Sequence, residues 1–167
     1  MKNNLHLSGQ GLVLLKSIEK PRLKPYDDQT GQDIAVWWKG ATIGYGHLIL
    51  AHEWDQYKKG INEAMAGNLF MTDLSKYAYS VSSKVTVSLS QHQFDALVIF
   101  AYNVGIEGFS SSSVVRLVND PNAQTAQKSL ESAWKAWNKS QGVVNAGLVN
   151  RRNAEWKIYS KNIYQGW

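Results

Sequence analysis

The sequence predicts an α+β fold with a small antiparallel sheet lobe and a larger, mainly helical lobe. Short extended runs separated by turns occupy residues 22–46, and beyond residue 72 the apolar residues recur at helical spacing. The length of 167 residues suits one domain with a sizeable core. We therefore expect a single domain, with its sheet lobe at about 20–70 and its helical lobe at about 71–167 plus the N-terminal helix. A cleft between two lobes is a common place for a site.

Composition and charge limit the possible functions. Hydrophobic residues make up 44% of the chain and charged residues 19%, which is typical of a globular protein and argues against disorder. The absence of cysteine excludes disulfides, thiolate metal sites and a cysteine nucleophile. The formal net charge of +5 suits a polyanionic partner such as nucleic acid, anionic lipid or bacterial cell wall. No apolar run is long enough to span a bilayer, so stable membrane insertion is not expected.

The first predicted element is an amphipathic helix of about ten residues. Ser8 is a suitable N-cap, and Leu12, Leu15 and Ile18 follow at three-residue spacing. Pro21 should end the helix, because the residue before a proline avoids the helical region. The apolar stretch is broken by polar residues, so we interpret it as a helix rather than a signal peptide.

Three extended runs follow the first helix. They are "RLKPY" from residue 22, "DIAVWW" from residue 33 and "ATIGYG" from residue 41, separated by the turn-like "DDQTG" and "KG". This pattern predicts a three-stranded antiparallel meander. The next segment, "HEWDQYKKGINEAM", is typical of a weak helix or a loop.

The remaining chain is predicted to be helical. Several helices there begin at residue types that cap helices: Thr72, the capping box Ser90 and Gln93, and the N-cap and N1 pair Asp120 and Pro121. The helix after Ser90 is apolar on most sides and should be the central buried one. Residues 147–159 are predicted to form the last helix. The four serines at 110–113 indicate a linker or a helix cap.

Two carboxylates near the first helix indicate possible chemistry. Glu19 is expected in the last helical turn, where unpaired carbonyls disfavour an ionised carboxylate, so it can stay protonated and act as a general acid. Asp28 lies in a polar, turn-rich stretch, where a carboxylate stays ionised. Two carboxyl groups in contrasting settings are typical of glycosidic bond cleavage. Spacing alone is equally compatible with a surface glutamate and a turn aspartate.

Three ordered motifs resemble those of one family. The first is Glu19, eight intervening residues, Asp28 and then "TIGYGH" at residues 42–47. The others are "LSQHQFDALVIFAYNVG" at 89–105 and "GLVNRRNAE" at 147–155. Together they resemble the phage-type lysozymes, the muramidase endolysins of glycoside hydrolase family 24. The resemblance runs from about Leu12 to Tyr159 and implies a lysozyme-like fold.

The resemblance implies a role for each carboxylate. Glu19 would be the general acid, Asp28 would position or deprotonate the attacking water, and Thr42 would help to hold that water, with inversion at the anomeric carbon. The family pattern has five residues between the aspartate and the threonine, whereas this chain has thirteen. We interpret the difference as a longer hairpin. Asp27 competes with Asp28 but lacks the eight-residue spacing, and Thr30 competes with Thr42 but lacks the following "IGYGH".

Three further residues are candidates for substrate binding. The resemblance implies that His47 is a structural histidine beside the site. It also places Asn103 to contact a sugar N-acetyl group, the alternative being a polar residue at a helix end paired with backbone. Trp37 and Trp38 alternate on a predicted strand, so one of them, assigned as Trp38, can stack on a sugar ring.

Other conspicuous residues have structural interpretations. Trp134 and Trp137 at helical spacing are expected in the core. Of Arg151 and Arg152, one is expected to be structural and the other to lie on a solvated face. No metal-ligand motif is present, so neither a metal nor a cofactor is expected.

The resemblance implies hydrolysis of the β-1,4 bond between N-acetylmuramic acid and N-acetylglucosamine in bacterial peptidoglycan. The expected protein is a bacteriolytic, inverting lysozyme and a monomer, either a phage endolysin or a domain of a secreted antibacterial protein. It would be made in the bacterial cytoplasm and act on the periplasmic or extracellular wall, with no signal peptide visible. The alternative is a catalytically impaired wall-binding module. Charge alone suggests nucleic acid, but no recognition motif supports it, so that partner is not expected.

Overall fold

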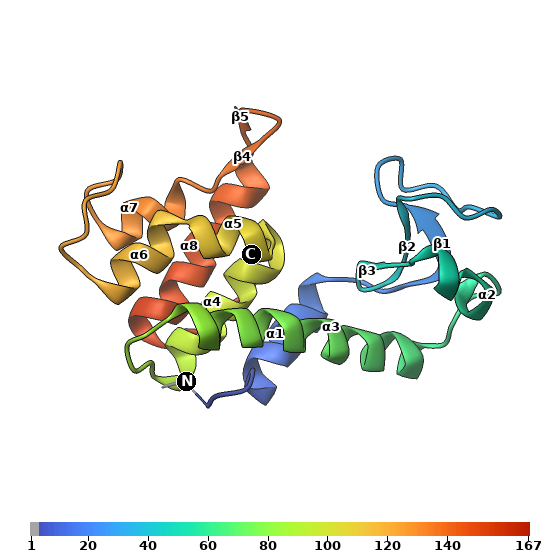
Figure 1. The fold of residues 1–167 in the computed structure, drawn as a ribbon, viewed down its shortest axis with the longest axis horizontal. Helices are drawn as coiled ribbons and strands as arrows, with labels where there is room; N and C mark the ends of the chain where they lie inside the picture. The colour runs from blue at the N-terminus through green and yellow to red at the C-terminus, as the bar shows by residue number, and fades with distance from the viewer. Residues whose placement is uncertain (1–3) are drawn as a thin grey trace. The chain divides into compact units, whose positions relative to one another are not determined.

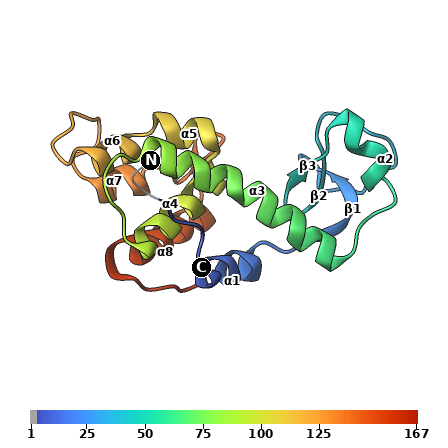
Figure 2. The same cartoon turned by 60° about the horizontal axis from the view of Figure 1, so that its bottom comes forward.

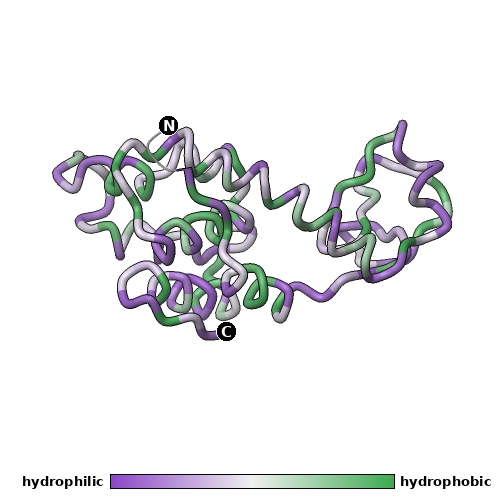
Figure 3. Tube along the Cα trace, turned by 90° about the horizontal axis from the view of Figure 1, so that it is seen from below, coloured by the Kyte–Doolittle hydropathy of each residue, from purple (hydrophilic) through white to green (hydrophobic). Residues whose placement is uncertain are grey.

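The computed structural model describes residues 4–167, which fall into two compact units (Figure 1). The helical unit contains the chain up to Ile18 and again from Ser75 onward, and the sheet unit contains Glu19–Leu74. Hydrophobic residues occur along the trace of both (Figure 3), and each has buried apolar side chains of its own. None of the helices in residues 4–167 is long and apolar enough to cross a membrane.

The sheet unit is built on three short antiparallel strands in sequence order. These are β1 (Arg22–Asp27), β2 (Ala41–Gly44) and β3 (His47–Leu48). Tyr26 on β1 lies opposite Thr42 on β2. The strands are followed by the 3₁₀ helix η1 (Ala51–Glu53) and by α2 (Trp54–Tyr57). Buried apolar side chains form the core of this unit: Ala41, Ile43, Ile49 and Tyr57.

The predicted strand "DIAVWW" is wrong. Only Asp33 makes an isolated bridge, to Tyr26, and the third strand of the sheet is β3 instead. The Arg22 side chain binds the Asp33 carboxylate at 2.6 Å, and the Ile34 N–H donates to the Pro25 carbonyl at 3.0 Å. These contacts hold the segment against β1 as a loop, so its apolar residues do not form a regular ladder.

A long helix, α3 (Glu63–Lys84), follows α2 and begins well before the predicted cap at Thr72. Asn62 provides the observed cap, because its side-chain oxygen accepts from the Met65 N–H at 2.8 Å. Thr72 lies within the helix and donates to the Asn68 carbonyl at 3.0 Å. The predicted cap is therefore wrong, although the helix itself was expected.

The helical unit begins with α1 (Gly9–Ile18), which confirms the first predicted helix. Ser8 Oγ accepts from the Gly11 N–H at 3.0 Å, as expected of its N-cap. The predicted capping box at Ser90 and Gln93 is confirmed at the start of α4 (Gln91–Val104), whose residues 94–101 are all buried. α4 packs against α8 (Ala146–Lys161), the predicted last helix (Figure 2).

Along the sequence, α4 and α8 are separated by three short helices and a small hairpin: α5 (Ile106–Ser111), α6 (Ser113–Asn119), α7 (Leu130–Lys135), β4 (Lys139–Ser140) and β5 (Val143–Val144). Ser112 caps α6, so the four serines do contain a helix cap. The predicted helix start at Asp120 is wrong. Its carboxylate accepts from the Asn122 N–H at 2.9 Å in a turn, and α7 begins only after its cap at Ser129.

A buried ionic cluster joins α7 to α8. The Glu155 carboxylate is fully buried and accepts from Trp134 Nε1 at 2.9 Å, Arg151 Nε at 3.0 Å and Arg152 Nη2 at 2.9 Å. Burial raises the pKa of Glu155, while the two guanidiniums oppose that shift. Both arginines are buried, so the expectation of a solvated face for one of them is wrong. Trp134 is fully buried as expected, and Trp137 is half-buried.

A second buried carboxylate, Asp95, connects α1, α4 and the C-terminal tail. Asp95 accepts from the Ser8 N–H at 3.0 Å and from the Ser8 hydroxyl. It also accepts from Gln91 Nε2 at 2.8 Å and from the Tyr164 hydroxyl at 2.6 Å. These four donors compensate the burial of its charge.

The bond between Tyr164 and Asp95 predicts a loss of stability at alkaline pH. Burial, and then this hydrogen bond, raises the pKa of the Tyr164 hydroxyl above its usual range. A raised pKa means that the folded state keeps a proton that the unfolded state releases, so the contribution is present below about pH 10 and is lost as pH rises further. Tyr164→Phe should therefore be less stable than the parent at pH 7, and the difference should shrink above pH 10.

Urea unfolding of the two proteins at pH 7, 9 and 11 measures this difference. Tyr79→Phe is the matched control, because Tyr79 is exposed, and its stability should follow the parent at every pH. A difference between Tyr164→Phe and the parent that stays constant across the series would contradict the assignment.

Candidate active site

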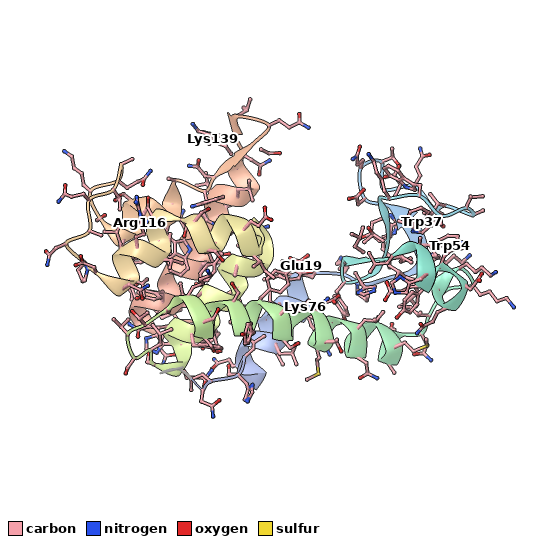
Figure 4. The ribbon with its side chains drawn as sticks, in the orientation of Figure 1. Glu19, Trp37, Trp54, Lys76, Arg116 and Lys139 are labelled. Atoms are coloured by element: carbon pink, nitrogen blue, oxygen red, sulfur yellow. The ribbon has the colours of Figure 1, made fainter. Side chains whose placement is uncertain are left out.

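Glu19 lies one residue past the end of α1, not in its last turn as expected. Figure 4 shows it where the chain leaves that helix. Its side chain is half-buried. The chain then passes Pro21 and enters β1.

Asp28 lies in the turn that directly follows β1, and it is exposed. Its N–H donates to the Gly40 carbonyl at 3.1 Å. The competing carboxylate, Asp27, belongs to the turn itself: its side chain accepts from the Gln29 N–H at 2.8 Å and its carbonyl from the Gly31 N–H at 2.7 Å. The turn therefore uses Asp27 structurally and presents Asp28 at the surface.

Thr42 is brought to Asp28 by a shared hydrogen-bond acceptor. Thr42 lies on β2 with 4% of its surface exposed, and its hydroxyl donates to the Gly40 carbonyl at 3.1 Å. The same carbonyl accepts from the Asp28 N–H, so the thirteen-residue segment closes with both residues at its base. Thr30, the weaker candidate, accepts from the Gln32 N–H at 3.3 Å in the exposed turn.

Tyr26 is a further candidate at the site, which the sequence did not indicate. It lies on β1 opposite Thr42, with the Arg22 guanidinium 4.3 Å from its ring centre. Burial raises the pKa of Tyr26, Arg22 opposes the shift, and the charges of Asp28 and Glu19 raise it further. Both carboxylates are therefore within electrostatic reach of one phenol. Strand alternation could have indicated it, because Tyr26 precedes Asp28 by two positions.

The remaining candidates are held by contacts within their own units. His47 Nδ1 lies 2.9 Å from the Asp73 carboxylate on α3, with Glu53 at 3.6 Å from its other ring nitrogen. Trp38 is half-buried against the core of the sheet unit. Asn103, in the helical unit, is exposed, and its side-chain oxygen accepts from Arg152 Nη2 at 2.6 Å rather than from the backbone.

The sheet unit thus carries a half-buried carboxyl group at a helix end, an exposed carboxylate in a turn and a buried threonine hydroxyl next to it. Such a set can donate a proton from one group and orient a water with the other two. Within residues 4–167, no three His, Asp or Glu side chains are placed to hold a metal ion.

Comparisons with known proteins identify the family of this chain. The family model described as phage lysozyme matches residues 16–155. The endolysin of Bacillus phage PZA is 36% identical over 166 residues, covering 97% of this chain but 59% of that relative's own length. The endolysin of Salmonella phage P22 is 31% identical over 157 residues, covering 93% of this chain and 98% of the relative.

Solved structures show the same fold. The endolysin from Escherichia coli O157:H7 phage FAHEc1 superposes with a TM-score of 0.78 at 28% identity, covering 99% of each chain. The muramidase domain of SpmX from Asticaccaulis excentricus gives a TM-score of 0.73 at 30% identity, covering 93% of this chain and 98% of that one. The predicted α+β, lysozyme-like fold is therefore confirmed. The chain belongs to the phage lysozyme family.

Proposed function

We propose that this chain hydrolyses the β-1,4 bond between N-acetylmuramic acid and N-acetylglucosamine in bacterial peptidoglycan, causing lysis of the wall. The observation that carries the proposal is the pair Glu19 and Asp28, a half-buried carboxyl group at a helix end and an exposed carboxylate in a turn, with the Thr42 hydroxyl bonded to the same Gly40 carbonyl as the Asp28 N–H. Family membership supports it, since relatives are described as endolysins and a muramidase domain. The chain spans 59% and 57% of two Bacillus phage relatives.

In the proposed mechanism, Glu19 donates a proton to the glycosidic oxygen as the bond breaks. Asp28 orients and deprotonates a water, and the Thr42 hydroxyl helps to hold that water. The attack comes from the face opposite the leaving group, so the product has the inverted configuration. The bond from the anomeric carbon to the leaving oxygen breaks, a new bond to the water oxygen forms, Glu19 supplies one proton and Asp28 accepts one, so the reaction consumes one water and needs no cofactor.

Three further residues are proposed to take part in substrate binding. Asn103 is exposed and would contact a sugar N-acetyl group, His47 would support the strand turn beside the site, and Trp38 lies next to Asp28. The net charge of +5 favours approach to the anionic wall. We expect a protein made in the bacterial cytoplasm that acts, as a monomer, on the periplasmic or extracellular wall.

Incubation of purified peptidoglycan with the protein tests the proposal. New reducing ends should appear in proportion to enzyme and time, without new free amines, and NMR of the first product should show the inverted anomer. Release of free amines alone would indicate cleavage of the peptide instead. The thirteen-residue segment favours one alternative, a wall-binding module, which would sediment with sacculi and release no fragments.

A further inference from the structure

Gly40 lies where two side chains meet. It is buried, and a methyl group added to its Cα would lie 2.6 Å from the Asp28 carboxylate oxygen. The same methyl group would lie 2.6 Å from Trp38 Cη2 and would overlap the adjacent ring atom Cζ2. The Asp28 carboxylate and the six-membered ring of the Trp38 indole therefore both occupy the space that a side chain at position 40 would need.

The backbone around Gly40 is fixed by several hydrogen bonds. The Ala41 N–H donates to the Trp38 carbonyl at 2.9 Å and closes a tight turn. The Gly40 carbonyl accepts from the Asp28 N–H and from the Thr42 hydroxyl, both at 3.1 Å. Trp38 packs on the core of the sheet unit. The indole therefore contacts this core, and its atoms Cζ2 and Cη2 lie beside Gly40, as does the Asp28 carboxylate.

We propose that Trp38 is a positioning residue for Asp28, and that position 40 must be glycine because any side chain there would displace the carboxylate or the ring. An exposed aspartate on a turn has several accessible rotamers, and a fixed wall beside it removes some of them. Small misplacements of a catalytic group lower the rate by large factors. This inference rests on the proposed function, in which Asp28 acts on the attacking water.

This role differs from the sugar-stacking role that the sequence suggested for Trp38. A stacking residue contributes to substrate affinity, so its loss raises KM. A positioning residue acts through Asp28, so its loss lowers kcat and leaves KM nearly unchanged. The two roles therefore predict different kinetic changes for the same substitution.

Trp38→Phe is the informative variant, because phenylalanine keeps an aromatic ring for the core but lacks the outer atoms that lie over Gly40. We expect kcat to fall about ten- to a hundredfold, with KM changed less than about twofold. Gly40→Ala keeps both Asp28 and Trp38 in the chain and should lower kcat similarly, because its methyl group would displace the carboxylate or the ring. Trp37→Phe is the matched tryptophan control, because the Trp37 indole N–H binds the Ile49 carbonyl at 2.9 Å. Gly9→Ala is the glycine control, because a methyl group at position 9 would have open space around it.

A double-mutant cycle decides whether Trp38 acts through Asp28. Adding Trp38→Phe to Asp28→Asn should cause no further loss of kcat beyond about twofold, because the group to be positioned is already removed. Equal losses in both backgrounds, or a change confined to KM, would overturn the proposal. If Asp28→Asn has no measurable turnover, the cycle cannot be completed, and an unchanged kcat in Gly40→Ala or in Trp38→Phe would then overturn the proposal. An inactive parent protein would instead overturn the proposed function, and the positioning role with it.

Discussion

Replacing Glu19 with glutamine is expected to lower kcat by about a hundred- to ten-thousandfold, the usual contribution of a general acid. Glutamine has nearly the same shape and keeps an acceptor oxygen, but it has no acidic proton to give to the leaving sugar. Release of reducing ends from purified peptidoglycan measures the loss. Because the side chain is half-buried at the end of α1 and its size is retained, the melting temperature should change little.

Two controls separate chemistry from folding in this experiment. Circular dichroism of Glu19→Gln should match that of the parent, and turnover equal to that of the parent would reject the acid assignment. Asp27→Asn is the matched carboxylate control. An asparagine at position 27 keeps the oxygen that accepts from the Gln29 N–H, so the turn is preserved and activity should remain, whereas Asp28→Asn should lose most of it.

The second large effect is on stability. Glu155→Gln is expected to lower the free energy of unfolding by about 3–5 kcal/mol, because it leaves the buried guanidiniums of Arg151 and Arg152 without their counter-charge. Urea denaturation followed by circular dichroism measures the change. The amide can keep one hydrogen bond to Trp134, so the loss reports the charge more than the shape.

Glu131→Gln is the matched control for the buried pair. Glu131 pairs with Lys135 at the same i,i+4 spacing as Arg151 and Glu155, but its side chain is about half exposed. Exposed pairs of this kind contribute less than about 1 kcal/mol. If the two substitutions lower the free energy of unfolding by the same amount, burial of the cluster would not be the source of its contribution to stability.

The elements that the sequence predicted well are those whose signals are local. The capping box at Ser90 and the apolar run of α4 are both read within a few residues, and so are the Ser8 cap and the break at Pro21. The start of α3 was missed because Asn62 is one of many polar residues in that stretch, and nothing local distinguishes it from a loop. "DIAVWW" has strand composition, but the Arg22 side chain, eleven residues before Asp33, binds the Asp33 carboxylate and holds the segment as a loop.

The candidate site shows the same division. Spacing selected Asp28 over Asp27, and the following "IGYGH" selected Thr42 over Thr30; in the structure the turn uses Asp27 and Thr30 for its own hydrogen bonds. The roles of Glu19, Asp28 and Thr42 stay predictions. Tyr26 was missed because its electrostatic contact with both carboxylates exists only after folding. The burial of both arginines could have been predicted from the sequence, since Glu155 follows Arg151 and Arg152 at helical spacing.

The hydrogen bonds to the Asp95 carboxylate indicate how the order of segments along the chain can be changed. Ser8 and Tyr164 both hydrogen-bond to it, so two segments from opposite ends of the sequence lie within a few ångströms of each other in the helical unit. A short flexible linker can join them into a circular permutant. New ends can be opened at Gln141 and Gly142, in the exposed β4–β5 turn, where cutting the backbone breaks only a two-residue ladder.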